Sequence, residues 1–92
     1  MNTTLESEKI LTKGDYFLLA TRKWDNKTED FLPVDDTTTA TQTFNEYSNA
    51  ETAYFSMNYK NCPQSGGKDI KIELIHMRFG LPHIVRNQIL FP

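Results

Sequence analysis

The fold is decided by a stretch that reads Thr37-Thr38-Thr39-Ala40-Thr41-Gln42-Thr43-Phe44, then Asn45-Glu46-Tyr47, then Ser48-Asn49-Ala50-Glu51. β-Branched residues dominate its first part, which favours a strand. Its last part has the spacing of a capping box, in which the Ser48 hydroxyl accepts a hydrogen bond from the Glu51 N–H and the Glu51 side chain accepts one from the Ser48 N–H. The stretch therefore predicts a strand that runs into a capped helix.

The predicted helix runs from about residue 49 to residue 60. Four apolar residues recur at helical spacing on one stripe, as expected for a helix packed on a sheet: Ala50, Ala53, Tyr54 and Met57. Phe55 and Tyr59 fall on the other side of the same helix, so a single sheet cannot cover both sets. We expect Phe55 and Tyr59 to be exposed or covered by the N-terminal arm.

Two strands are predicted before the helix. Residues 15–24 are apolar at both odd and even positions up to Ala20, which indicates a central strand. Asp25-Asn26-Lys27-Thr28 has turn chemistry. The return begins at Phe31, but Pro33 cannot donate to a ladder, so we expect an edge or a bulged interruption before residues 37–44 resume pairing.

Two further strands follow the helix. In residues 70–79 the apolar positions are Ile70, Ile72 and Leu74 on one parity, then Ile75, Met77 and Phe79 on the other. One extra residue near Leu74-Ile75, a β-bulge, would keep both trios on the core side. A strand end that leaves the sheet is the alternative. A turn at residues 80–82 then leads to a last strand over residues 84–91.

These segments predict an α+β fold, an antiparallel sheet of four to five strands with a single α-helix (about residues 49–60) packed on one face. With 92 residues, the chain is expected to be a single domain over residues 1–92, in which residues 1–14 form an N-terminal arm with one helical turn. The single cysteine, Cys62, excludes an internal disulfide. No apolar leader or membrane span is recognisable, so we expect a cytoplasmic protein without a membrane partner.

Catalytic and metal-binding patterns are not found in the sequence. His76 and His83 have no Cys, Asp or Glu beside them at metal-ligand spacing. Cys62 lies beside Pro63 in a loop, which is a poor support for a nucleophile. Ser65-Gly66-Gly67-Lys68 resembles a phosphate loop but precedes a strand instead of opening a helix. We therefore expect no enzyme activity, cofactor, metal or small-molecule substrate.

A basic and aromatic group lies at the first predicted hairpin, where Arg22, Lys23 and Lys27 surround Trp24. Such a group can attract phosphate and stack on an unpaired base. The formal net charge of −2 argues against an independent nucleic-acid binder. An ordinary solvated hairpin tip is the alternative interpretation.

An acidic group follows within eight residues: Glu29, Asp30, Asp35 and Asp36. Charges at a sheet edge can serve only to prevent pairing with another chain. The same charges can instead form a surface that is complementary to a basic, nucleic-acid-binding partner. Both interpretations stay open at the level of sequence.

Four segments resemble the hairpin, capped helix and strand module of small phage-encoded anti-CRISPR proteins, most closely those directed against type I-F surveillance complexes: residues 16–20, 39–44, 48–57 and 70–75. The resemblance implies a non-enzymatic inhibitor in the host cell cytoplasm. It would bind host Cas protein subunits, with the guide RNA as a further contact, and block target DNA binding. These families share no functional motif, so no binding residue is carried over.

The binding residues we predict therefore rest on surface chemistry alone. The acidic group would contact protein, and the Trp24 hairpin would contact RNA or protein. A second hypothesis is a small structural or accessory module without catalytic activity, from a phage or a bacterium, that self-associates through Phe55 and Tyr59.

Overall fold

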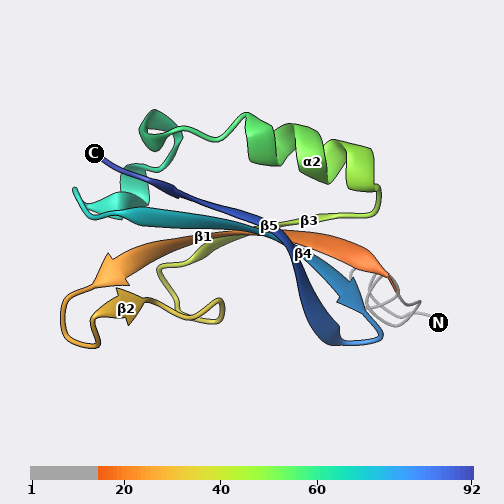
Figure 1. Cartoon of the computed structure of the whole chain (residues 1–92), viewed down its shortest axis with the longest axis horizontal. Coiled ribbons are helices and arrows are strands. Elements are labelled where there is room, and N and C mark those ends of the chain that lie inside the picture. The colour runs from red at the N-terminus through yellow and green to blue at the C-terminus, as the bar shows by residue number, and fades with distance from the viewer. Residues whose placement is uncertain (1–14) are drawn as a thin grey trace.

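The computed structural model describes residues 15–92, and the predicted N-terminal arm lies outside the described residues. Within residues 15–92 the elements follow in this chain order, and Figure 1 labels the strands and the α-helix: β1 (Tyr16–Asp25), β2 (Asp30–Phe31), β3 (Ala40–Phe44), α2 (Tyr47–Phe55), the 3₁₀ turns η1 (Tyr59–Asn61) and η2 (Pro63–Ser65), β4 (Ile70–Arg78) and β5 (Leu81–Leu90).

All strand pairs are antiparallel. β1 and β4 form the centre of the sheet, β5 pairs with β4, and β2 and β3 both pair with β1. The sheet is curled, and α2 lies across one of its faces (Figure 1). The predicted α+β architecture is confirmed.

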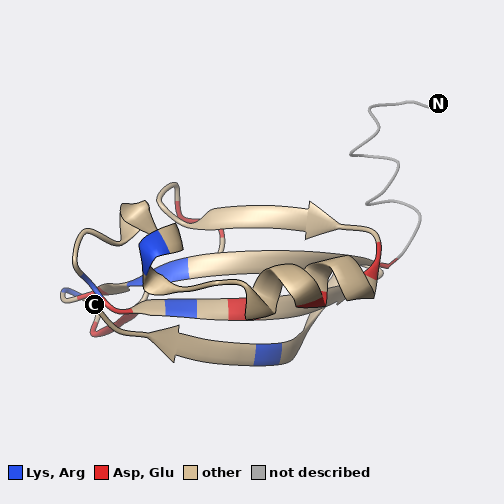
Figure 2. Ribbon diagram, turned by 90° about the horizontal axis from the view of Figure 1, so that it is seen from above, with Lys and Arg blue, Asp and Glu red and all other residues tan. Residues whose placement is uncertain are grey.

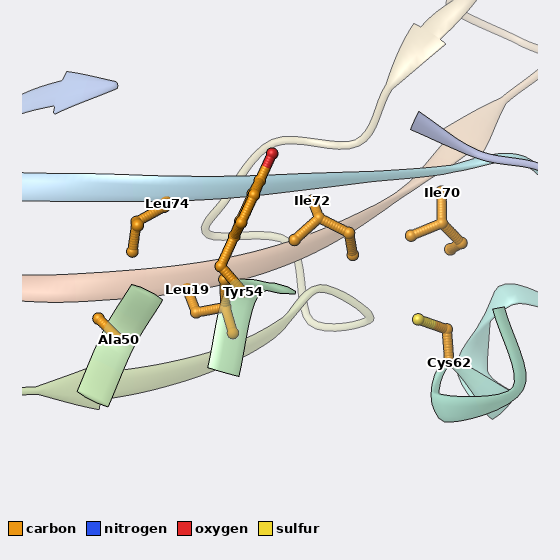
Figure 3. Packing of buried hydrophobic residues seen from close by; sticks show 7 residues of the cluster. All are labelled: Leu19, Ala50, Tyr54, Cys62, Ile70, Ile72 and Leu74. Carbon is orange, nitrogen blue, oxygen red and sulfur yellow. The ribbon is translucent and has the colours of Figure 1, made fainter. Parts of the chain in front are cut away.

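The core lies between α2 and the facing side of β1 and β4 (Figure 3). Its fully buried aliphatic residues alternate along the two central strands: Leu19, Ile70, Ile72 and Leu74. Ala50 and Tyr54 project from α2 onto them. Each buried side chain of leucine or isoleucine size stabilises the fold by about 1.5–3 kcal/mol. Cys62 closes one end of this core, and burial raises the pKa of its thiol.

The helix begins and ends earlier than predicted, and the predicted capping box is wrong. Glu46 is the N-cap residue, and its side chain makes no capping hydrogen bond. Ser48 therefore lies inside α2. The Glu51 carboxylate accepts from the Tyr47 hydroxyl at 2.8 Å instead of returning to Ser48. Tyr47 also packs edge-to-face on Phe17, with ring centroids 5.4 Å apart, and this contact holds the first turn of α2 against β1.

Tyr59 lies beyond the end of α2, so the predicted face shared by Phe55 and Tyr59 does not exist. The Tyr59 hydroxyl donates to the Lys68 carbonyl at 2.7 Å, and the ring packs against the core. The Asn58 side chain accepts from the Asn61 N–H and starts the separate turn η1. Local side-chain bonds of this kind compete with helix continuation.

The irregularity predicted near Leu74-Ile75 is present, but its extra residue lies on β5. Leu74 is opposite Arg86 and Ile75 is opposite Ile84, so Val85 is the unpaired residue of a β-bulge. β4 itself is regular against β1. Leu74 and Ile75 consequently point to opposite faces, and both are buried. The prediction that both apolar trios face one core is wrong.

Candidate interaction surface

The sheet face opposite α2 contains a buried ion pair. Arg22 Nη1 lies 3.0 Å from Glu73 Oε1, and the exposed fractions of the two side chains are 17% and 3%. Lys71 Nζ lies 3.7 Å from the other Glu73 oxygen. A carboxylate this deeply buried is stable only when it is paired. Arg22 and Lys71 provide that pairing.

Arg22 also fixes the segment that follows β2. Its Nε donates to the Leu32 carbonyl at 2.6 Å, and its Nη2 donates to the Phe31 carbonyl at 3.3 Å. The guanidinium therefore connects this segment to a central strand through Glu73. Arg22, predicted as a cation that meets a partner, has its donors used within the fold.

The other residues of the predicted basic group are not brought together. Trp24 is half-buried in β1, its ring packs edge-to-face on Phe31 with centroids 5.2 Å apart, and its Nε1 donates to Asn26. Lys23 directly precedes Trp24 on the strand, so the two side chains point to opposite faces of the sheet. Lys27 is exposed at the hairpin tip. Near the hairpin tip, Trp24 and Lys27 are therefore the residues of this group that remain accessible to a partner.

The acidic group lies on the β1–β2 hairpin and the loop that follows it. Glu29, Asp30 and Asp35 are exposed, and Asp36 is half-buried. Within residues 15–92, none of these four carboxylates forms an ion pair. Figure 2 shows the acidic positions as red bands along the ribbon. The group is thus an acidic surface that other described residues do not neutralise.

Side-chain hydrogen bonds fix the turn that precedes this acidic group and the turn at its end. Asp25 accepts from the Lys27 N–H and the Thr28 hydroxyl, and the bond from Lys27 is the main reason that the pKa of Asp25 is lowered. Asp36 accepts from the Thr38 hydroxyl and N–H, which lower its pKa in the same way. These aspartates shape the turns. We define the acidic segment as residues 29–36, in which Glu29, Asp30 and Asp35 project into solvent.

A second cluster, between α2 and β5, was not predicted. Arg86 lies over the Phe55 ring at 5.1 Å from its centroid and 3.3 Å from Glu51 Oε2. Hydrogen bonding to Tyr47 and the charge of Glu51 raise the pKa of Arg86. Phe55 is 62% exposed, which is one of the two alternatives expected from the sequence. Arg86 is 35 residues from Glu51, so no local spacing could reveal the cluster.

The candidate reactive residues Cys62 and His76 take part in packing. Cys62 is buried, and its Sγ lies 3.5 Å from the Asn58 carbonyl. His76 stacks on Phe17 at 4.6 Å, and its Nε2 lies 3.2 Å from Asp15. In the described part of the chain, no group of three or more His, Cys, Asp or Glu side chains could hold a metal ion. No helix within residues 15–92 has the length and apolar character needed to cross a bilayer.

Comparison of the chain with protein-family models, with curated proteins and with solved structures gave no match.

Proposed function

We propose that this protein is a small inhibitor that binds a basic surface of a nucleoprotein assembly through the acidic segment. The observation that supports this proposal is the set of three exposed carboxylates, Glu29, Asp30 and Asp35, on a backbone whose ends are fixed by hydrogen bonds. In the form implied by the sequence resemblance, the protein is phage-encoded and acts in the host cell cytoplasm. It binds Cas subunits of a type I-F surveillance complex and blocks target DNA binding.

The physical argument concerns competition with DNA phosphates. A groove that binds DNA is lined with Lys and Arg, and the affinity of DNA for it depends on neutralising those charges. Carboxylates on a fixed backbone can occupy the same positive field, and opposite potentials accelerate the encounter. Because Arg22 already holds the segment on the sheet, binding costs little additional ordering. Trp24 and Lys27 would add a contact to protein or guide RNA beside the acidic segment.

The alternative, self-association through Phe55 and Tyr59, has less support, because the Tyr59 hydroxyl donates to the Lys68 carbonyl and the Tyr59 ring packs on the core. Phe55 alone stays exposed in that predicted pair.

The test measures whether the protein prevents a purified type I-F surveillance complex from binding labelled target DNA. The variant Glu29→Gln/Asp35→Asn removes two exposed negative charges without touching the turn-forming Asp25 or Asp36. We expect its association rate with the complex to fall about 10-fold at low salt and its salt dependence to weaken. DNA binding by the complex should then recover.

The matched control is Glu46→Lys, which changes the net charge by the same amount at an exposed position whose side chain makes no capping bond. It should inhibit like the wild type. Equal losses in both variants would mean that only net charge matters, and this would remove the role of the acidic segment. Undisturbed DNA binding at saturating wild-type protein would overturn the inhibitor proposal for this complex.

A further inference from the structure

β5 is an edge strand with an apolar surface. Among the described residues it pairs only with β4, so its outer backbone groups have no strand partner (Figure 1). Its ten residues include four exposed large apolar side chains, at 43–64% exposure: Leu81, Ile84, Val85 and Ile89. A long edge of this kind is a site for pairing with another strand.

The two edges of the sheet differ in how they are protected. β3 is five residues long, and its exposed positions are Ala40, Thr41, Gln42 and Thr43. β5 contains no Lys, Asp or Glu, and its edge-protecting features, Pro82 and the bulge at Val85, lie at or before residue 85. Its single permanent charge, Arg86, is directed to Glu51 and Phe55 on α2. A strongly charged partner strand would therefore find no unpaired charge of opposite sign along β5.

The sequence of β5 is close to symmetric about Asn87. Three polar residues, 86–88, lie between the apolar pairs 84–85 and 89–90. Antiparallel pairing of two copies about Asn87 places Val85 opposite Ile89 of the second copy. The symmetric pairing spans residues 85–89, because the bulge at Val85 puts Ile84 and Leu90 on opposite faces of the sheet. Arg86 is then opposite Gln88, so like charges are not placed opposite each other. The occupant that fits this strand on both polarity and charge is a second copy of the strand.

We propose that β5 pairs antiparallel with β5 of a second copy, so that two sheets join across a two-fold axis near Asn87. This gives a closed, isologous interface in which each strand contributes the same residues. Because the contact is one strand edge and its flanking side chains, it lies at the small end of specific interfaces. We expect a dimer that dissociates on dilution. This inference does not depend on the inhibitor proposal.

The first test follows molar mass by sedimentation equilibrium from about 1 µM to about 1 mM. The wild type should shift from monomer to dimer across this range. Ile89→Lys inserts a charge beside Val85 of the second copy and should raise the dissociation constant at least 10-fold. Thr41→Lys, at an exposed position on the opposite edge, is the matched control and should dimerise like the wild type.

The second test fixes the register. Asn87→Cys places one thiol of each copy across the axis, where oxidised glutathione should produce a disulfide-linked dimer. Gln42→Cys on β3 is the control, and the native Cys62 is buried. A wild type that stays monomeric up to about 1 mM would overturn the proposal. So would cross-linking of Asn87→Cys no faster than Gln42→Cys, or a dimer that Phe55→Ala disrupts and Ile89→Lys does not. Binding of an extended peptide to β5 by a chain that stays monomeric would also overturn it.

Discussion

Replacing Arg22 with Met tests the role assigned to the buried ion pair. The change leaves the Glu73 carboxylate, 3% exposed, with Lys71 Nζ at 3.7 Å as its remaining cation. Breaking one side of a buried pair typically costs 3–5 kcal/mol, and the presence of Lys71 favours the lower end, about 3 kcal/mol. A domain of this length has about 5–14 kcal/mol of total stability, so the loss should be easily measured.

The assay is urea unfolding followed by far-ultraviolet circular dichroism and by Trp24 fluorescence. Fluorescence should report a change in Arg22→Met before global unfolding, because the lost bonds to Phe31 and Leu32 free the strand that packs on Trp24. Glu73→Gln should cost less, about 1–2 kcal/mol, since Arg22 keeps its two carbonyl acceptors. If Arg22→Met does not fold, Arg22→Lys is used in its place. It should still lose more stability than Glu73→Gln, although less than Arg22→Met.

The single variant Glu73→Leu and the double variant Arg22→Met/Glu73→Leu complete a double-mutant cycle with Arg22→Met. Replacing a buried pair by apolar residues is often neutral, so the stability of the double variant should return to within about 1 kcal/mol of the wild type. The reasoning would be refuted if Arg22→Met cost under about 1 kcal/mol, or if the double variant lost the sum of the two single changes. Either result would mean that the pair is solvated and does not hold the acidic segment.

Three further outcomes are expected. Ser48→Ala should leave the urea midpoint unchanged or slightly higher, because Ser48 lies inside α2 and alanine is the better helix former by about 0.5 kcal/mol; a loss above 1 kcal/mol would restore the capping role. Trp24→Ala and Phe31→Ala should show a coupling energy of about 0.5–1.5 kcal/mol in a denaturation cycle, and additive losses would contradict their edge-to-face contact. The pKa of Asp36 is lowered in the folded state, so its contribution to stability is full above its ordinary value of 3.8 and is lost as the pH falls through the folded pKa. Asp36→Asn should therefore flatten the decline of stability below about pH 4, and an unchanged acid limb would count against the bonds from Thr38.

The strands and the apolar stripe of the helix were predictable because they depend on local periodicity. Residues 15–24 and 70–79 alternate or run apolar as strands do, and Ala50 and Tyr54 are spaced as one helical face. The ends of the helix were not predictable in the same way. Ser48 and Glu51 match a cap in spacing, but the ring of Phe17 is available to Tyr47 only in the folded sheet.

The contacts of the charged residues were not predictable for a related reason. From the sequence, Arg22 looks like part of a solvated hairpin, whereas its acceptors are 10 and 51 residues away, at Leu32 and Glu73. Arg86 likewise finds Glu51 from 35 residues away. Opposite charges that are distant in sequence carry no local spacing signal, so only the topology shows which cations are used inside the fold.

The bulge at Val85 links the fold to both proposed surfaces. Continuing the register of Ile75 with Ile84 along β5 without an extra residue would place Arg86 opposite Glu73, on the face away from α2. The extra residue instead sets Arg86 opposite Leu74, beneath the helix, where it reaches Glu51. Glu73 is thereby left to Arg22, which holds the acidic segment. The same shift leaves the β5 edge without an exposed unpaired charge, which is the condition for pairing with its own copy.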